Sequence, residues 1–392
     1  MSKRVGGFIN QDGLNAPDPA TGVSGTAGDE QVDVSFTAPS DVGGAAVSGY
    51  RVTDTTGAHG ASGSASPITV TGLTNDTAYT FRVWAINSFG WSSPSDASGS
   101  VTPAFIPTAW FAGGGSNIID FVAIATTGNA TDWGDLQSSV SNTAGCSSAT
   151  RGLVQRNYTG NVDYITFATQ GNSVSFGNLS SARDADGALA NGTRGVFAGG
   201  EGSAAFSNII DFFTIASTGN ATDFGDLSVG RQNVSGYASS TRGCFNMGEV
   251  SPGGAYTDTI DFITIASAGN ATDFGDATQS LKNSAGCSSS TRGIIMGGNN
   301  PSSSNVIQYV TIASAGNAID FGDLTVVASG CAGASSETRG LRAGGENVGT
   351  TSNSNVIDYI TIASTGNATD FGDLTTSRTE VVGLSNAHGG LS

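Results

Sequence analysis

Charged side chains are scarce in this 392-residue sequence. They make up 12% of the chain, about half the share usual in globular proteins. Lysine is almost absent, since Lys3 and Lys282 are its two examples, and the arginines are scattered. With a formal net charge of −17, the chain lacks the clustered cations that nucleic acids and anionic membranes require. We therefore expect neither nucleic acid binding nor membrane insertion.

Long apolar runs and helical patterns are also missing. No run of 18 apolar residues is present, so no membrane-spanning helix is expected. The first ten residues lack the apolar core of a signal peptide, which predicts that the chain does not use that export route. No segment keeps a 3.6-residue period with caps. Helix content should accordingly be very low.

Residue types that hold metals or carry redox chemistry are few. His59 and His388 are the two histidines, and no His pair, HExxH motif or Cys–His cluster occurs. None of the four cysteines forms a CxxC pair, and each lies in a strand-like stretch of small residues, so buried free thiols are expected: Cys146, Cys244, Cys287 and Cys331. We expect no metal, no cofactor and no enzymatic activity.

Internal repeats fill the second half of the chain. A Thr-Arg-Gly motif, or a close variant, recurs about every 43–50 residues, with its arginine at Arg151, Arg194, Arg242, Arg292 and Arg339. An Asp-Phe/Trp-Gly-Asp motif recurs in step with it, with its first aspartate at Asp132, Asp223, Asp273, Asp320 and Asp370. A degenerate copy at residues 175–178 brings the number to six. Each copy contains four short strand-like runs separated by Gly, Asn and Ser, and repeats of this length are typical of β-propeller blades.

The Gly-Asn pair between the third and fourth runs, as at Gly219-Asn220, is expected to form a tight hairpin. The motifs resemble kelch repeats, which have an Arg opening the first strand, a Gly doublet, an aromatic residue in the third strand and a Trp in the fourth. Those places are held here by Arg231, Gly199-Gly200, Phe212 and Phe224. Phe replaces Trp in most copies, and the Gly doublet decays in two of them.

The last strand-like run, at residues 379–385, is expected to pair with residues 110–113 because an open ring would expose unpaired strand edges. The fold prediction is all-β, with a six-bladed kelch-like propeller over residues 105–392 that is closed by the C-terminal strand.

The repeated aspartates raise the question of paired catalytic carboxylates, as in glycoside hydrolysis. A residue present in every repeat serves every repeat, whereas catalysis needs one asymmetric constellation. Asp223-type and Arg242-type residues recur together, so we predict a structural Asp–Arg bond between strands.

The first hundred residues alternate apolar and polar positions, most clearly over residues 78–87. The segment Gly72-Leu73-Thr74-Asn75-Asp76-Thr77-Ala78-Tyr79 resembles the tyrosine corner of fibronectin type III domains. The resemblance covers residues 16–104 and implies a β-sandwich with Phe36, Tyr79 and Trp84 in its core and a buried Tyr79 hydroxyl bound to backbone. Residues 1–15 are expected to be an unpaired arm.

Sequence variation among the repeats is greatest after each Gly doublet. These loops are rich in Ser, Asn, Gly and Thr, and they favour either polar recognition, such as glycan binding, or a role as tolerant linkers. The candidate partner-binding residues in them are Phe206, Tyr256, Asn299, Asn300 and Asn347.

This combination of an arm, a fibronectin-like module and an acidic, repetitive propeller looks like a bacteriophage virion protein, a tail-fibre-like appendage. The resemblance implies a structural protein of the phage particle that is assembled in the host cytoplasm. Residues 1–104 would dock to other virion proteins, and the propeller loops would meet a host-surface glycan or protein, with many copies or a homo-oligomer on each particle. The alternatives are an intracellular kelch-type protein-binding scaffold and, less favoured, a propeller glycosidase or oxidase.

Overall fold

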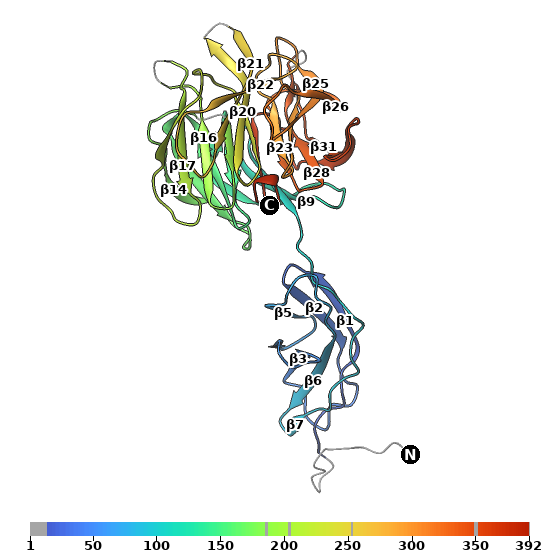
Figure 1. Cartoon of the computed structure of the whole chain (residues 1–392). Coiled ribbons are helices and arrows are strands. Elements are labelled where there is room, and N and C mark those ends of the chain that lie inside the picture. Colours follow the sequence, from blue (N-terminus) through green and yellow to red (C-terminus); the bar gives the residue numbers. More distant parts are fainter. Residues whose placement is uncertain (1–13, 185–186, 203–204, 252–253, 349–351, 392) are drawn as a thin grey trace. The chain divides into compact units, whose positions relative to one another are not determined.

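The computed structural model describes residues 14–184, 187–202, 205–251, 254–348 and 352–391. Residues 1–13 of the predicted arm lie outside this part. The chain divides into two compact units, Met1–Ile106 and Pro107–Ser392, called here the sandwich unit and the repeat unit. Strands account for 54% of residues and helix for 2%, which confirms the all-β prediction. Figure 1 shows the two units, and each is described by itself.

The sandwich unit contains two antiparallel sheets. The first has the order β1-β2-β5, formed by β1 (Thr21–Gly28), β2 (Gln31–Thr37) and β5 (Ile68–Thr71). The second has the order β4-β3-β6-β7, formed by β4 (Gly60–Gly63), β3 (Gly49–Asp54), β6 (Phe81–Asn87) and β7 (Gly90–Trp91).

The sequence predicts that three residues lie in the core of this unit, and two of them contact it. Phe36 is buried against Tyr50, with 4.7 Å between ring centroids. The Tyr79 hydroxyl accepts a hydrogen bond from the Thr74 backbone N–H at 3.0 Å, which confirms the predicted bond to backbone, but the side chain is half-buried and not buried as predicted. The prediction for Trp84 is wrong. Because side chains alternate along β6, Phe81 and Val83 face the core and Trp84 lies on the opposite face.

In the part of the repeat unit that the structure describes, the strands form six four-stranded antiparallel sheets, numbered here in chain order. Figure 1 shows their arrangement. Sheet 1 has the order β10-β9-β8-β33, from β8 (Thr108–Gly113), β9 (Ser116–Ala123), β10 (Thr131–Val140) and β33 (Val381–Ser385). Sheet 2 contains β11 (Gly145–Ser147), β12 (Arg151–Arg156), β13 (Asn161–Thr166) and β14 (Val174–Asn178), and sheet 3 contains β15 (Gly187–Ala190), β16 (Arg194–Ala198), β17 (Ile209–Thr214) and β18 (Thr222–Asp226).

Sheets 4 to 6 repeat this arrangement. Sheet 4 contains β19 (Ser235–Ala238), β20 (Arg242–Ser251), β21 (Ala255–Thr264) and β22 (Thr272–Asp276), and sheet 5 contains β23 (Ala285–Ser288), β24 (Arg292–Met296), β25 (Ser304–Thr311) and β26 (Ile319–Ala328). Sheet 6 contains β27 (Ala332–Ser335), β28 (Arg339–Ala343), β31 (Val356–Thr361) and β32 (Thr369–Asp373). The short pair β29 (Glu346–Asn347) and β30 (Ser352–Asn353) lies between β28 and β31.

The C-terminal strand completes the first sheet, as the sequence predicts. β33 pairs with β8 in antiparallel register, with Val381 opposite Gly113 and Ser385 opposite Ala109. Strands from the two ends of the repeat unit therefore share one sheet. This pairing covers the edge of β8 that would otherwise be exposed.

We count the strands of each sheet from one edge, so that the first strand is β33 in sheet 1, β11 in sheet 2, β15 in sheet 3, β19 in sheet 4, β23 in sheet 5 and β27 in sheet 6. These first strands contact one another in cyclic order: β11, β15, β19, β23, β27, β33 and again β11. Glycine allows this close approach, because a Cβ on Gly286 would lie 2.5 Å from the Gly236 carbonyl oxygen of the neighbouring strand. Serine hydroxyls add bonds between these strands. Ser147 donates to the Ser385 carbonyl at 2.8 Å, and Ser335 donates to the Ser288 carbonyl at 2.7 Å.

The outer edges of the sheets are joined by the Gly-Asn pairs. Each asparagine side chain accepts a hydrogen bond at 3.1 Å from a backbone N–H of the preceding sheet, at Asn129, Asn172, Asn220, Asn270, Asn317 and Asn367. Asn129, in sheet 1, binds Asp373 of sheet 6, so these bonds also follow a cycle. The predicted tight hairpin is wrong, because seven residues separate β17 from β18. The Gly-Asn pair instead connects neighbouring sheets.

Candidate functional site

The arginines of the Thr-Arg-Gly motif connect consecutive sheets. Arg242 lies over the Phe262 ring, 4.5 Å from its centroid, and donates to the Ile312 carbonyl of the next sheet at 2.9 Å. The other four make the same two kinds of contact: Arg151, Arg194, Arg292 and Arg339. These arginines therefore have a structural role.

The repeated aspartates do not bind these arginines, so the predicted Asp–Arg bond is wrong. Asp223 lies on the exposed side of β18, the outermost strand of sheet 3, whereas the Arg242 guanidinium is occupied by a ring and a carbonyl group of sheets 4 and 5. The other members of the set are also exposed on outermost strands: Asp132, Asp273, Asp320 and Asp370.

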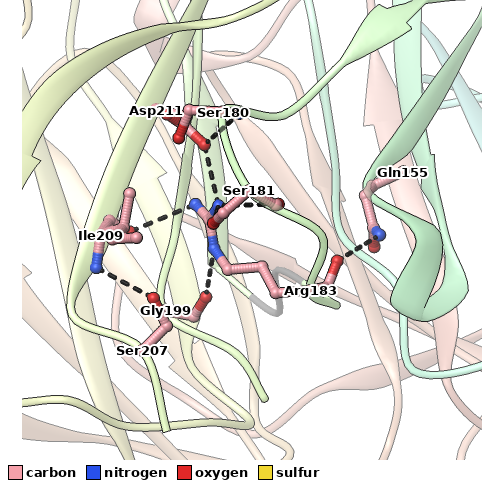
Figure 2. Close-up of polar contacts among 8 residues, drawn as sticks. All are labelled: Gln155, Ser180, Ser181, Arg183, Gly199, Ser207, Ile209 and Asp211. Carbon is pink, nitrogen blue, oxygen red and sulfur yellow. Dashed lines mark hydrogen bonds and ion pairs between the residues drawn. The ribbon is translucent and has the colours of Figure 1, made fainter. Parts of the chain in front are cut away.

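A second, unpredicted set of Asp–Arg pairs is buried inside the sheets. Figure 2 shows the pair in sheet 3, where Arg183 and Asp211 approach to 2.8 Å. The same guanidinium donates to the carbonyls of Gly199 at 3.1 Å and Ile209 at 3.3 Å. This one arginine thus joins the segment before the first strand to the second and third strands.

Among the described residues, five of the six sheets contain such a pair. The aspartate always comes from the third strand, and the pairs are Asp120–Arg378, Asp163–Arg156, Asp211–Arg183, Asp261–Arg231 and Asp358–Arg342. In sheet 5, Gln308 stands at the aspartate position and accepts from the Thr278 N–H at 2.7 Å. Burial lowers the pKa of Arg231, and the Asp261 charge opposes that shift. Recurrence in five sheets and burial make these pairs structural, not catalytic.

The aspartate of each pair can be recognised from the sequence. An Asp or Gln falls at the same place in every third-strand run, between an Ile or Val and an aromatic residue. The arginines carry a weaker signal because they come from three different places. Arg183, Arg231 and Arg378 precede the first strand, Arg342 lies in the second strand, and Arg156 ends it.

The variable loops connect the second and third strands of the sheets. The hairpin of β20 and β21 is the longest in the repeat unit, with Glu249 paired to Tyr256 (Figure 1). Lys282 binds the Glu249 carboxylate at 2.9 Å and lies 5.5 Å from the centroid of the Tyr256 ring. Gln232 donates to the same carboxylate at 3.2 Å. We call these four residues the hairpin cluster.

The hairpin cluster fixes the protonation state of Glu249. Burial acts to raise the pKa of this carboxyl group, but the hydrogen bonds from Lys282 and Gln232 outweigh burial and lower it. The cluster therefore presents a paired carboxylate and an amphipathic tyrosine at the base of an extended hairpin. Such a surface suits polar recognition and offers no free base for catalysis.

The other candidate loop residues have different surroundings. Asn299 is buried and accepts from the Ser329 hydroxyl at 2.7 Å, so its role is structural. Asn300 is exposed and donates to the Ser280 carbonyl at 2.9 Å. Asn347 lies in β29, opposite Ser352, and the half-buried Phe206 forms a β-bridge with Glu201. The five candidates belong to four different sheets, and each lies in or beside the connection between the second and third strands of its sheet.

A cavity of about 150 Å³ lies among the first strands of the six sheets, lined mostly by Gly, Ala and Ser. Glu380 and Asn142 line it together, and the Asn142 backbone N–H donates to the Glu380 carboxylate at 3.3 Å. Burial raises the pKa of Glu380, and the charge of Glu346 adds to this rise. The small, uniform lining provides little to orient a substrate.

His388 also lines this cavity, and its two ring nitrogens have different roles. Nε2 lies 2.7 Å from the Ser147 carbonyl oxygen, and Nδ1 accepts from the Gly390 N–H at 3.1 Å. A carbonyl can only accept and an N–H can only donate, so the contacts specify the neutral imidazole with its proton on Nε2. Burial lowers the pKa of His388, which agrees with this assignment.

Groups suited to metal or thiol chemistry do not gather at these positions. Within the described residues, no group of three or more His, Cys, Asp or Glu side chains could hold a metal ion. All four cysteines are free and buried, as predicted, and burial raises the pKa of each thiol: Cys146, Cys244, Cys287 and Cys331. No helix among the described residues is long and apolar enough to cross a membrane.

Comparison with known proteins assigns one part of the chain. No curated protein matches the sequence. Residues 17–100 match the fibronectin type III domain, and they include the two sheets and the Tyr79 corner described above. The sandwich unit therefore contains a fibronectin type III domain at residues 17–100.

Proposed function

We propose that residues 105–392 form a six-bladed, kelch-like β-propeller. Three features support this proposal. The first strands contact one another in cyclic order, the Gly-Asn bonds follow the same cycle at the outer edges, and β33 pairs with β8. The Phe224-type aromatic residues and the Gly199-Gly200-type doublets occupy equivalent strands and turns of successive sheets.

We further propose that the chain is a structural, non-enzymatic component of a bacteriophage particle, part of a tail or head appendage. The observation that carries this proposal is the division of the repeat unit into a uniform frame and variable loops. Interactions that recur from sheet to sheet build the frame, and sequence differences concentrate in the connections between second and third strands. A fibronectin type III domain precedes this unit, an arrangement suited to spacing and display.

In this proposal, residues 1–104 dock to other virion proteins and the propeller loops meet the host surface. The hairpin cluster is the best-defined loop feature, because Tyr256 offers an amphipathic ring beside the Lys282–Glu249 pair. Individual contacts of this kind are weak, but many copies on one particle raise the effective affinity. Assembly in the host cytoplasm followed by lysis needs no export signal.

Immunogold labelling tests the virion assignment. Antibodies raised against residues 105–392 should label appendages of purified particles in electron micrographs. Antigen that stays in the particle-free lysate, with no label on particles, would contradict the assignment.

A loop graft tests the attachment role. Replacing residues 250–255 with a short Gly-Ser turn keeps Glu249 and its bonds to Lys282 and Gln232 while changing the connection between β20 and β21. We expect at least tenfold weaker attachment of particles to host cells with little change in thermal stability. Ile319→Ala is the matched control, because Ile319 is 59% exposed on the outermost strand β26 and away from the loops. Equal attachment by parent and graft would remove this hairpin from the proposed contact.

A further inference from the structure

The outer face of the sheet β4-β3-β6-β7 has an unusual composition. Along β6, the residues that alternate with the core positions are Arg82, Trp84 and Ile86. Arg51 on β3 lies directly opposite Trp84, and Trp91 on β7 lies opposite Ile86. Two arginines and two tryptophans thus share one face, with Cβ atoms of directly opposed residues about 5 Å apart.

These four residues are all the arginines and tryptophans of residues 14–106, a segment with no lysine. The face is therefore a local concentration of cations in a chain whose net charge is −17. Arg51 is exposed and has no hydrogen-bond or ion-pair partner among the described residues, while Arg82 donates to the Ser95 carbonyl at 3.0 Å. The guanidinium of Arg51 remains available to a ligand.

Trp91 is 49% exposed and lines an open groove on this face. Arg51 and Thr53 line the groove from β3, and residues 57–62, which include the end of the β3–β4 turn and the start of β4, form its wall. That turn is held in place by His59, whose Nδ1 lies 3.0 Å from Asp54 Oδ2. The exposed Trp91 side chain, the free Arg51 guanidinium and a wall built mostly of small residues therefore line one groove.

This combination matches one class of ligand. A tryptophan face packs against the apolar face of a sugar ring, and a planar guanidinium binds a carboxylate through two parallel hydrogen bonds. The groove is open to solvent, so a sugar bound in it can belong to a longer chain. We propose that the outer face of the fibronectin type III domain binds a carboxylate-bearing polysaccharide, with a sugar ring on Trp91 and a sugar carboxylate on Arg51.

The inference is independent of the proposed virion role, since it rests on residues of the sandwich unit alone. An acidic protein surface is the competing occupant, because it also supplies carboxylates. Its carboxylates would bind Arg51, but its binding would depend less on a contact with the exposed Trp91 side chain. Loss of binding in variants of each residue therefore separates the two.

Binding of the full chain to immobilised polygalacturonate at about 0.15 M salt tests the proposal, with neutral dextran and poly-L-glutamate as comparison polymers. We expect binding to polygalacturonate and at least tenfold weaker binding to the other two. Trp91→Ala and Arg51→Gln should each weaken polygalacturonate binding at least tenfold. Phe89→Ala is the matched control, because Phe89 is 43% exposed two residues from Trp91 and does not line the groove. It should bind within about twofold of the parent.

Three outcomes would overturn the proposal: no polygalacturonate binding at millimolar sugar, equal binding of poly-L-glutamate, or parent-like binding by Trp91→Ala. The substituted side chains are exposed, so the variants should fold, and an unchanged unfolding midpoint checks this. The hairpin graft described above should leave polygalacturonate binding unchanged. Failure of that graft to affect attachment would therefore count against the virion loops and not against this site.

Discussion

At the scale of single residues, the buried Arg231–Asp261 pair stabilises the fold only while both partners are present. Both side chains are fully buried, and the two groups approach to 3.1 Å. Asp261→Asn removes the charge that balances Arg231, so we expect the free energy of unfolding to fall by about 3–5 kcal/mol. Urea unfolding of parent and variant measures the difference.

Sheet 5 supplies the matched control for that change. Leu281 and Gln308 occupy the positions of Arg231 and Asp261 there, and the sheet keeps the same four strands. The double variant Arg231→Leu/Asp261→Gln copies this solution and should unfold at a urea concentration close to that of the parent, because no charge is left buried and unpaired. A double variant as unstable as Asp261→Asn would show that the charge balance is not what matters.

His388 makes stability depend on pH. Its pKa is lower in the folded chain than the ordinary value of 6.5, because burial disfavours the imidazolium form. The unfolded chain therefore binds the proton more readily, and stability falls as the pH drops below about 6.5. Protonation at Nδ1 also abolishes the bond from the Gly390 N–H. We expect this contribution to lower the melting temperature of the parent relative to that of His388→Gln between pH 7 and 5.

His388→Gln isolates this contribution, because glutamine keeps a donor for the Ser147 carbonyl and does not titrate. Asp184 acts with the opposite sign: burial raises its pKa to about 6, so its neutral form stabilises the fold at low pH. The difference between parent and His388→Gln at each pH cancels the Asp184 effect. A parallel pH profile for the two proteins would contradict the role assigned to His388.

At the scale of elements, the Gly-Asn connections determine how well neighbouring sheets are joined. The Asn270 side chain accepts from the Asp226 N–H at 3.1 Å, so Asn270→Ala should cost about 0.5–1.5 kcal/mol. Gly225→Ala should cost more, because φ is +144° and the new Cβ would lie 2.5 Å from the Gly269 carbonyl group. Ser267→Ala, an exposed change in the same turn, is the control for thermal unfolding. Equal melting temperatures for all three variants would contradict this account.

The same connections show how far a strand pattern predicts an element. The alternation and the β-branched runs correctly place strands such as β17 and β21, because each must bury a face. The Gly-Asn pair has the composition of a hairpin turn, so the sequence predicts a tight hairpin there. Its actual partner is a backbone group about 44 residues away, in another sheet. Composition reports the local conformations that a turn allows, but not the distant group that it binds.

At the scale of the whole molecule, the repeats predict the pairing between the two ends of the repeat unit. They do not predict the buried Asp–Arg pairs inside the sheets. Six copies with the first strand missing at one end and an extra strand at the other predict that residues 379–385 join residues 110–113, and β33 does pair with β8. The buried pairs are hard to predict because their arginines come from three different places in the repeat. Variability and polar composition single out the loop candidates, but neither distinguishes the buried Asn299 from the exposed Asn300.

Removing the last strand should therefore cost more than its length suggests. Truncation after Glu380 keeps the Arg378–Asp120 pair but uncovers β8, where Trp110 is 2% exposed and Phe111 is fully buried. The free edge and its aromatic residues favour pairing with other chains. We expect a lower melting temperature and soluble aggregates, measured by light scattering.

A peptide of residues 379–391 added in excess should restore the parent behaviour by adding a strand to β8. The same peptide carrying Leu384→Asp is the control, because Leu384 is 2% exposed in the β33–β8 pairing and a buried aspartate there would have no partner. Rescue by the first peptide alone would show that the repeat unit is held together by the specific pairing of its two ends. A truncated chain that stays monomeric with an unchanged melting temperature would show that the other five sheets are stable without that pairing.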